Sequence, residues 1–235
     1  MNRKPFFFKQ FKIFQDKTAM KVGTDGVLLG AWANTLFANE ILDIGTGTGL
    51  IALMLCQKNE NSIVTAIEIE KNAFDQAVEN IKLSKWQNNI SVIHTSIQEF
   101  KTQKKFDLIV SNPPFFNNSF SAKNKSRNIA RQTDSLSFEI LLKRTASLLS
   151  KSGKACFIIP FSEKYIFLKI ASNNNLFLNK TLNIKGNIKT KIKRVLMEFS
   201  FQETELDENT LAIEIFRHVY TDDYLDLVQD FYFKM

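Results

Sequence analysis

The sequence predicts an α/β fold with a mostly parallel sheet, and three observations support this fold class. From residue 41 onward, short apolar runs alternate with stretches of helical periodicity, which is the pattern of repeated strand–helix units. One of these runs is followed by a glycine-rich loop (45–49) and another by a polar turn with two prolines (111–114). Loops of this kind follow the strands at the edge of an α/β sheet where ligands bind. Near the C-terminus, strand-like runs follow one another without a helix between them, which predicts antiparallel additions to the sheet.

The expected elements follow from these periodicities in chain order. Residues 6–14 interleave Phe and Lys and predict a short strand or hairpin. Because Phe clusters are usually buried, a flap packed on the core is favoured, and an RNA-facing surface is the alternative. The expected strands are 41–44, 63–67, 90–93, 106–110, 155–159, 176–184, 191–201 and 211–216. The expected helices are 27–33, 50–57, 72–83, 138–149 and 223–231.

Length and composition limit the classes of protein that the chain can belong to. The 235 residues suit a single domain over 1–235, with 1–35 as an N-terminal extension and 36–235 as the core. A net charge of +7 suits a phosphate-rich partner, although solubility explains it equally well. The two cysteines and two histidines have no metal-ligand spacing, so we expect no metal. No apolar run approaches membrane-spanning length, so we expect a cytoplasmic protein without a membrane partner.

The glycine-rich loop indicates what kind of ligand the sheet edge binds. Its glycines are Gly45, Gly47 and Gly49. The dinucleotide-binding fingerprint needs its third glycine one residue later, where this chain has Leu50. Asp43 precedes the loop, and a carboxylate there suits an ammonium group but repels a pyrophosphate. Glu68 ends the next strand, where a carboxylate can accept hydrogen bonds from both hydroxyls of a ribose.

The turn after the strand 106–110 suggests a second half of the same site. Proline lacks the N–H that a sheet ladder needs, so Pro113 and Pro114 end the strand and hold Asn112 at its edge. The Asn112 amide, a backbone carbonyl and the aromatic rings of Phe115 and Phe116 suit a planar group that carries an NH2. A capping Asn in a proline-stiffened loop is the alternative interpretation, which the neighbouring glycine loop disfavours.

Asp43, the glycine loop, Glu68 and the Asn112–Phe115 turn together resemble the motifs of class I S-adenosylmethionine-dependent methyltransferases. Members with this N-P-P-[YF] turn methylate planar nitrogens. The resemblance implies a Rossmann-like, seven-stranded sheet whose last pair is antiparallel, and S-adenosyl-L-methionine as the cofactor. It implies cofactor contacts from Asp43, Gly45, Thr46, Gly47, Gly49, Glu68, Ile69, Ser96, Ile97 and Asn112.

The same resemblance assigns the catalytic positions to Asn112, Pro113, Pro114 and Phe115. It implies that Asn112 Oδ1 and the Pro113 carbonyl accept the two hydrogens of the target amine, while Phe115 or Phe116 stacks on the base. Ser96 departs from the pattern, because many relatives place an acid there that holds the amino group of the cofactor adenine. Backbone groups at Ile97 are expected to take over that contact.

Residues 14–32 and 220–232, with Ala130 and Arg131 after the turn, resemble bacterial tRNA1(Val) (adenine-N6)-methyltransferases over nearly the whole length. Those enzymes modify adenosine 37, so the resemblance implies a tRNA partner; we also expect a monomer. The basic residues after the turn are expected to bind this substrate together with Phe116: Lys123, Lys125, Arg127 and Arg131. A second basic cluster is equally well interpreted as a solvated face: Lys185, Lys189, Lys191, Lys193 and Arg194.

Two other functions remain as alternatives. Glutamine N5-methyltransferases that act on release factors share the N-P-P-Y turn, but they usually carry a separate N-terminal helical domain. Here only about forty residues precede the first strand of the core. A non-catalytic RNA-binding relative is the other alternative, and the intact set of Asp43, Glu68 and Asn112 disfavours it.

Overall fold

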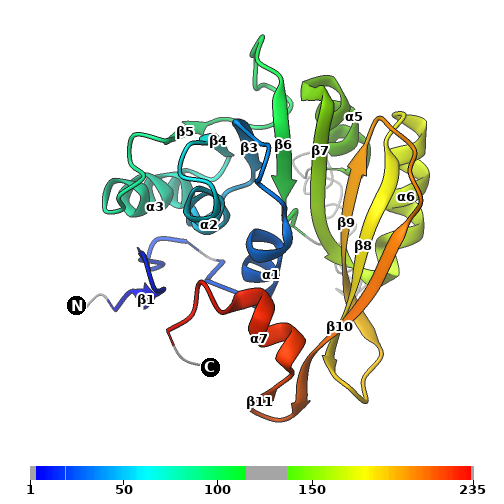
Figure 1. Cartoon of the computed structure of the whole chain (residues 1–235). Helices are drawn as coiled ribbons and strands as arrows, with labels where there is room; N and C mark the ends of the chain where they lie inside the picture. Colours follow the sequence, from blue (N-terminus) through cyan, green and yellow to red (C-terminus); the bar gives the residue numbers. More distant parts are fainter. Residues whose placement is uncertain (1–3, 19, 115–136, 234–235) are drawn as a thin grey trace, which may run out of the picture.

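The computed structural model describes residues 4–18, 20–114 and 137–233, and its centre is a nine-stranded sheet (Figure 1). The strand order is β11-β10-β8-β9-β7-β6-β3-β4-β5. The strands are β3 Glu40–Ile44, β4 Ile63–Glu68, β5 Ile90–His94, β6 Phe106–Ser111, β7 Leu149–Pro160, β8 Phe177–Asn187, β9 Ile192–Ser200, β10 Asp207–Phe216 and β11 Val219–Tyr220. Strands β3 to β7 pair in parallel, so their carboxyl ends meet at one edge of the sheet.

The C-terminal strands confirm the mixed sheet but differ in detail from the expectation. Strand β9 is antiparallel to both β7 and β8, and β11 is antiparallel to β10. Strand β10, however, pairs in parallel with β8. The sheet has nine strands, two more than the seven that the resemblance implied. Without β10, strand β8 would end the sheet with a row of unpaired backbone N–H and C=O groups, and β10 pairs them.

The helices cover both faces of the sheet. They are α1 Thr24–Trp32, α2 Leu50–Lys58, α3 Lys71–Lys82, α5 Phe138–Leu148, α6 Lys164–Asn173 and α7 Asp222–Val228, with a 3₁₀ turn, η1, at Phe161–Glu163. Helices α1, α2, α3 and α7 share one hydrophobic cluster, and α5 and α6 share the other. Helix α6 was absent from the sequence-based expectation, although its buried Phe167, Ile170 and Ala171 have helical spacing. Within the described residues, no helix is long and apolar enough to cross a membrane.

The sheet separates the two clusters because successive side chains of a strand point to opposite faces. In β6, Leu108 and Val110 join the cluster of α1 and α2, while Ile109 joins the cluster of α5 and α6. The strand is therefore apolar on both faces, as is usual for a central parallel strand. This burial fixes the position of the carboxyl end of β6 and of the turn that follows it.

The N-terminal hairpin packs on the core, as the favoured interpretation predicted. Strands β1 (Phe6–Phe7) and β2 (Lys12–Ile13) pair in an antiparallel manner. Phe8 is buried and stacks on Tyr232 with ring centroids 5.5 Å apart, and the Lys9 backbone N–H donates to the carbonyl of Phe231. The two ends of the described chain thus lie against each other.

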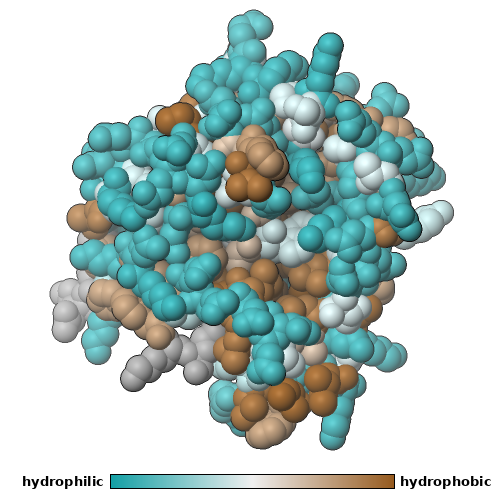
Figure 2. All heavy atoms as spheres, viewed as in Figure 1, coloured by the Kyte–Doolittle hydropathy of each residue, from teal (hydrophilic) through white to brown (hydrophobic). Residues whose placement is uncertain are grey.

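One face of the molecule shows where hydrophobic side chains remain exposed. In Figure 2 most of this face is hydrophilic, but hydrophobic side chains gather at the bottom of the view, over β11 and the end of β10. Phe216 at the end of β10 is 63% exposed. A single exposed apolar side chain is ordinary on a protein surface, whereas a group of them at one place marks a binding surface more often.

Candidate functional site

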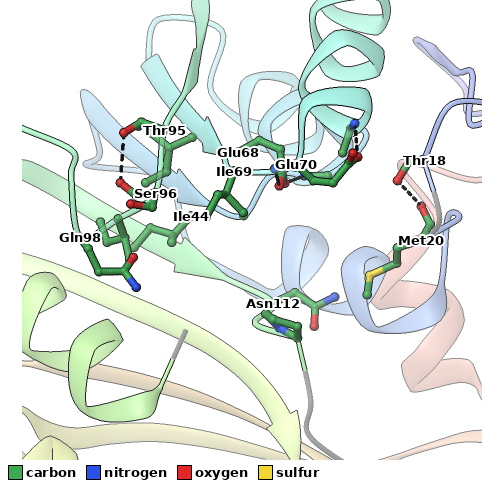
Figure 3. A pocket seen from close by; sticks show the side chains of 16 residues that line it. Thr18, Met20, Ile44, Glu68, Ile69, Glu70, Thr95, Ser96, Gln98 and Asn112 are labelled. Carbon is green, nitrogen blue, oxygen red and sulfur yellow. Dashed lines mark hydrogen bonds between the residues drawn. The ribbon is translucent and has the colours of Figure 1, made fainter. Parts of the chain in front are cut away.

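The carboxyl ends of β3, β4, β5 and β6 meet around a pocket of about 300 Å³ (Figure 3). This is the edge at which open α/β sheets bind ligands. The structure brings eight of the sequence-predicted site residues to its lining: Gly45, Gly47, Glu68, Ile69, Ser96, Ile97, Asn112 and Pro114. Asp43, Thr46, Gly49 and Pro113 lie behind this lining. Phe115, Phe116, Lys123, Lys125, Arg127 and Arg131 fall outside the described residues.

The glycine loop needs its glycines because of backbone conformation. Gly45, Gly47 and Gly49 have φ of 73°, 60° and 82°, the left-handed region that other residues rarely adopt. A Cβ added at Gly45 or Gly47 would meet no protein atom within 4 Å and would instead extend into open space. Both residues line the pocket, so a ligand can approach the bare backbone there. At Gly49, an added Cβ would lie in ordinary van der Waals contact with Ala77 and Ile81 of α3, which packs on the loop, so the positive φ is the constraint there.

Glu68 fastens the loop to the end of β4. Its Oε2 accepts the N–H of Gly47 at 2.9 Å, and its Oε1 accepts the N–H of Glu70 at 2.9 Å. Glu68 is nearly buried yet still lines the pocket. Each carboxylate oxygen has a second lone pair, so Glu68 can hold the loop and still accept hydroxyl hydrogens from a ligand.

Asp43 is fully buried beneath the loop and does not reach the pocket surface. Its Oδ2 accepts the Thr46 hydroxyl at 2.6 Å, while its Oδ1 has no hydrogen-bond partner in the described part of the chain. Burial raises the pKa of Asp43 to about 7, and Glu68 adds to the rise, whereas the Thr46 hydrogen bond lowers it. The structure therefore places Asp43 behind the loop backbone, where its charge is costly without a cationic ligand nearby.

Asn112 lies on the opposite wall of the pocket, at the end of β6 (Figure 3). The preceding Ser111 is buried, and its hydroxyl donates to the carbonyl of Ile44 at 2.8 Å, which joins the end of β6 to the start of the glycine loop. Asn112 itself is half-buried, and its side-chain amide makes no hydrogen bond to any described residue. An amide held on a rigid strand end, with no bond to the described residues, is suited to binding a polar ligand group.

Two comparisons with known proteins identify the family. The family model described as "Methyltransferase small domain" matches residues 14–159, which is more than half of the chain. The chain belongs to this methyltransferase family. It is also 47% identical to the tRNA1(Val) (adenine(37)-N6)-methyltransferase of Christiangramia forsetii, with all of both chains covered. The enzyme of the same name from Pseudoalteromonas translucida is 45% identical over 98% of this chain and 99% of its own.

Solved methyltransferase structures share the fold at much lower sequence identity. A predicted O-methyltransferase of Agrobacterium tumefaciens superposes with a TM-score of 0.65 at 15% identity, covering 88% of this chain and 96% of its own. A putative RNA methyltransferase of Pyrococcus horikoshii gives a TM-score of 0.54 at 16% identity, covering 74% and 80%. These likenesses confirm the predicted class I methyltransferase fold.

Membership of the family supports S-adenosyl-L-methionine as the cofactor, and the pocket fits this molecule. The bare glycine backbone leaves room for a close ligand, and Glu68 offers acceptors for ribose hydroxyls. The unpartnered, buried Oδ1 of Asp43 favours a cationic group on the other side of the loop. Among the described residues, no group of three or more His, Cys, Asp or Glu lies together as metal ligands would.

The end of β5 shows how the chain accommodates Ser96. The Ser96 hydroxyl accepts the N–H of Glu99, and the Ile97 carbonyl accepts Arg144 Nε at 3.0 Å. The Ile97 carbonyl is thus engaged, while Ile97 itself lines the pocket. Gln98, which sequence reasoning missed, also lines the pocket (Figure 3) and carries an amide oxygen that can accept an amino group.

Sequence reasoning also missed the segment that covers the pocket. Thr18 and Met20 line it from the N-terminal side, and the residues before them are bound to α3. Asn80 accepts the N–H of Phe14 at 2.8 Å and donates to the carbonyls of Phe14 and Thr48, both at 2.9 Å. Gln76 accepts the N–H of Lys17 at 3.0 Å. The sequence held one signal for this contact: the amides Gln76 and Asn80 stand on the buried face of an amphipathic helix, where apolar residues are usual, so each needs a hydrogen-bond partner.

Proposed function

We propose that the chain transfers a methyl group from S-adenosylmethionine to N6 of adenosine 37 in tRNA1(Val). The observation that carries this proposal is the Asn112 amide, which faces the pocket from a proline-stiffened strand end and has no hydrogen-bond partner among the described residues. Relatives of that name are 42–47% identical to the chain over essentially its whole length, which supports the choice of substrate.

The residues of the Asn112 turn have a defined task in this chemistry. The exocyclic nitrogen of adenine is a poor nucleophile, because its lone pair is delocalised into the ring. Asn112 Oδ1 and the Pro113 carbonyl accept its two hydrogens, so the lone pair is released from the ring and held in one direction. When bound, S-adenosylmethionine supplies an electrophilic methyl group on a sulfonium.

Positioning is the main contribution of the protein. With S-adenosylmethionine held beside Glu68 and the glycine loop, the nitrogen positioned by Asn112 would accept the methyl group and would then lose one proton to solvent. The hydrogen bond from Ser111 to Ile44 holds Asn112 at a fixed place relative to the glycine loop. Both reaction partners are therefore held on one sheet edge, and no covalent enzyme intermediate is needed.

We further propose that Phe115 and Phe116 stack on the target base and that Lys123, Lys125, Arg127 and Arg131 contact the tRNA backbone. These roles rest on the positions of the residues directly after Pro114 in the sequence. The base must be turned out of the anticodon loop to reach Asn112. A tRNA substrate is consistent with a cytoplasmic protein, and we propose that it acts there as a monomer without a metal.

Methylation of defined transcripts tests the proposal. Purified chain is incubated with S-adenosylmethionine and a tRNA1(Val) transcript, and the nucleosides are separated after digestion. We expect N6-methyladenosine with the native transcript and none when position 37 is replaced by guanosine. Methylation of a release factor in place of either RNA would instead support the glutamine N5 alternative.

A further inference from the structure

The far end of the sheet carries a second charged surface at the same edge as the pocket. The β8–β9 turn and the β10–β11 turn lie side by side there, and the N–H of Ile188 donates to the carbonyl of Glu214 at 3.0 Å. We call this surface the tip and define it by Ile188, Lys189, Lys191, Lys193, Phe216 and Arg217. Figure 1 shows both turns at the bottom of the molecule, on the side to which β6 and β7 point.

Strand register places the tip well beyond the catalytic turn. Ser111 is level with Phe157 of β7, and Pro160 of β7 is level with Arg194 of β9. Arg194 is in turn level with Ile184 of β8, which continues to Asn187. The tip therefore projects about 20 Å past Ser111, at roughly 3.3 Å per residue. It stands roughly three strand spacings, or about 14 Å, to the side of β6.

The charges of the tip are free to meet a partner. Lys189, Lys191 and Lys193 are exposed, and none has an ion-pair partner among the described residues. The neighbouring Arg194 differs, because its Nε donates to Asp25 at 2.8 Å and its charge is already compensated. The sequence analysis interpreted the second basic cluster as a possible solvated face. In the structure its three exposed lysines are available to a partner, whereas Arg194 joins β9 to α1 through its ion pair with Asp25.

Exposed apolar side chains lie among these charges. Phe216 is 63% exposed and Ile188 is 49% exposed, and Figure 2 shows hydrophobic side chains gathered over the end of β10. An exposed aromatic ring near cations that have no ion-pair partner among the described residues suits a nucleic acid, since a base can stack on the ring while phosphates meet the cations. If the tips of two copies of this chain met, the lysines of one tip would face the lysines of the other, and the like charges would repel each other.

We propose that the tip is a tRNA-binding surface that holds the substrate backbone and an unpaired base at a distance from the methylated adenosine. This inference rests on the proposed function, whose catalytic turn supplies the other contact with the RNA. Phosphate contacts at the tip fix the position of the tRNA without reading its sequence, and each releases counterions on binding.

The test compares two triple variants in which the same number of positive charges is removed. Lys189, Lys191 and Lys193 are replaced by Ala in one, and Lys82, Lys101 and Lys151 in the other. The second set is exposed, has no ion-pair partner among the described residues and lies toward the amino ends of the strands. We measure tRNA binding by filter retention over a salt series, the steady-state KM for tRNA, and cofactor affinity by calorimetry.

We expect the tip variant to weaken tRNA binding and raise the KM by about tenfold. In a plot of the logarithm of the tRNA binding constant against the logarithm of the salt concentration, the slope should decrease in magnitude by roughly 0.7 to 0.9 for each phosphate contact that the tip variant loses. The control variant should stay near wild type, and cofactor affinity should be unchanged in both. Equal slopes and KM values for the two variants would overturn the tip proposal. Filter binding measures tRNA affinity without turnover. A wild-type chain that binds tRNA but does not methylate it would therefore refute the proposed function and leave the tip proposal standing.

Phe216 gives an independent readout. Phe216→Ala should weaken tRNA binding at least about fivefold without changing the salt slope, because stacking involves no counterion release. Phe216→Tyr keeps the ring and should bind like wild type. If sedimentation shows a wild-type dimer that Phe216→Ala dissociates, the surface is an interface between copies of the chain and the proposal is wrong.

Discussion

The glycine loop and the Asn112 turn lie on neighbouring parallel strands, yet their polar groups are in opposite states. In the loop, the N–H groups of Gly45 and Thr46 donate to the Ile67 carbonyl, and that of Gly47 donates to Glu68. The Thr46 hydroxyl is bound to Asp43. On β6, the Asn112 amide has no such partner in the described part of the chain.

This difference matches the two ligands that the edge must serve. On the cofactor side, the loop N–H groups are already bonded within the protein, and the Asp43 Oδ1 is the buried acceptor that has no partner among the described residues. On the substrate side, the Asn112 amide bonds to no described residue, so it can bond to a ligand group that brings matching hydrogens. An unsatisfied polar group costs little while it is half exposed to water and becomes effective when the partner excludes water.

The largest effect should come from filling the loop. Gly47→Val puts a branched side chain at a residue with φ of 60° and extends it into the pocket, so cofactor binding should become undetectable by calorimetry. Gly23→Ala is the matched control, since Gly23 has an extended φ of −132° and its added Cβ meets only a carbonyl oxygen at 3.8 Å. Normal affinity in Gly47→Val would show that the ligand does not approach this backbone.

The opposite wall should respond in rate rather than in affinity. Asn112→Ala removes an acceptor that acts on the target amine as charge develops, so the turnover number should fall by about 10²- to 10³-fold. Cofactor affinity should fall far less than turnover, and thermal stability should change little, because the Asn112 amide bonds to no described residue. Stopped-time assays at saturating tRNA measure the rate, and near-normal turnover would remove Asn112 from the catalytic residues.

Sequence alone predicted the parallel core, the glycine loop and the Asn112 turn because local signals mark them. Glycines mark backbone with positive φ, as at Gly45, and consecutive prolines mark the end of a strand. The covering segment and the parallel pairing of β10 with β8 escaped because they depend on contacts distant in the chain, although a strand was expected at 211–216. Asn80 meets Phe14 across 66 residues, and nothing near either position in the sequence announces that contact.

Asn80 joins the covering segment to the glycine loop, and replacing it should have a smaller effect. Asn80→Ala leaves the N–H and C=O of Phe14 and the carbonyl of Thr48 without their partner, so the covering segment and the loop should both loosen. We expect cofactor affinity to fall about tenfold, with turnover at saturation nearly unchanged. Asn72→Ala, an exposed position on the same helix, should have no effect on either quantity. A fall in turnover with cofactor affinity unchanged would contradict the assigned role.

The charge that the loop hides should affect stability rather than binding or turnover. Burial raises the pKa of Asp43 to about 7, so the native chain keeps this proton at pH values where an unfolded Asp, with a pKa of 3.8, has released it. Between these values the native state binds more protons, and the free energy of unfolding should therefore fall as pH rises, by up to about 1.4 kcal/mol per pH unit.

Asp43→Asn isolates this contribution, because the amide oxygen can still accept the Thr46 hydroxyl but does not titrate. The stability of the variant relative to wild type should rise from roughly pH 4 to pH 7 and level off above. Urea unfolding of both proteins at several pH values in that range measures the difference. Parallel stability curves would show that Asp43 is already ionised in the native state, stabilised by the loop itself rather than waiting for a cationic ligand.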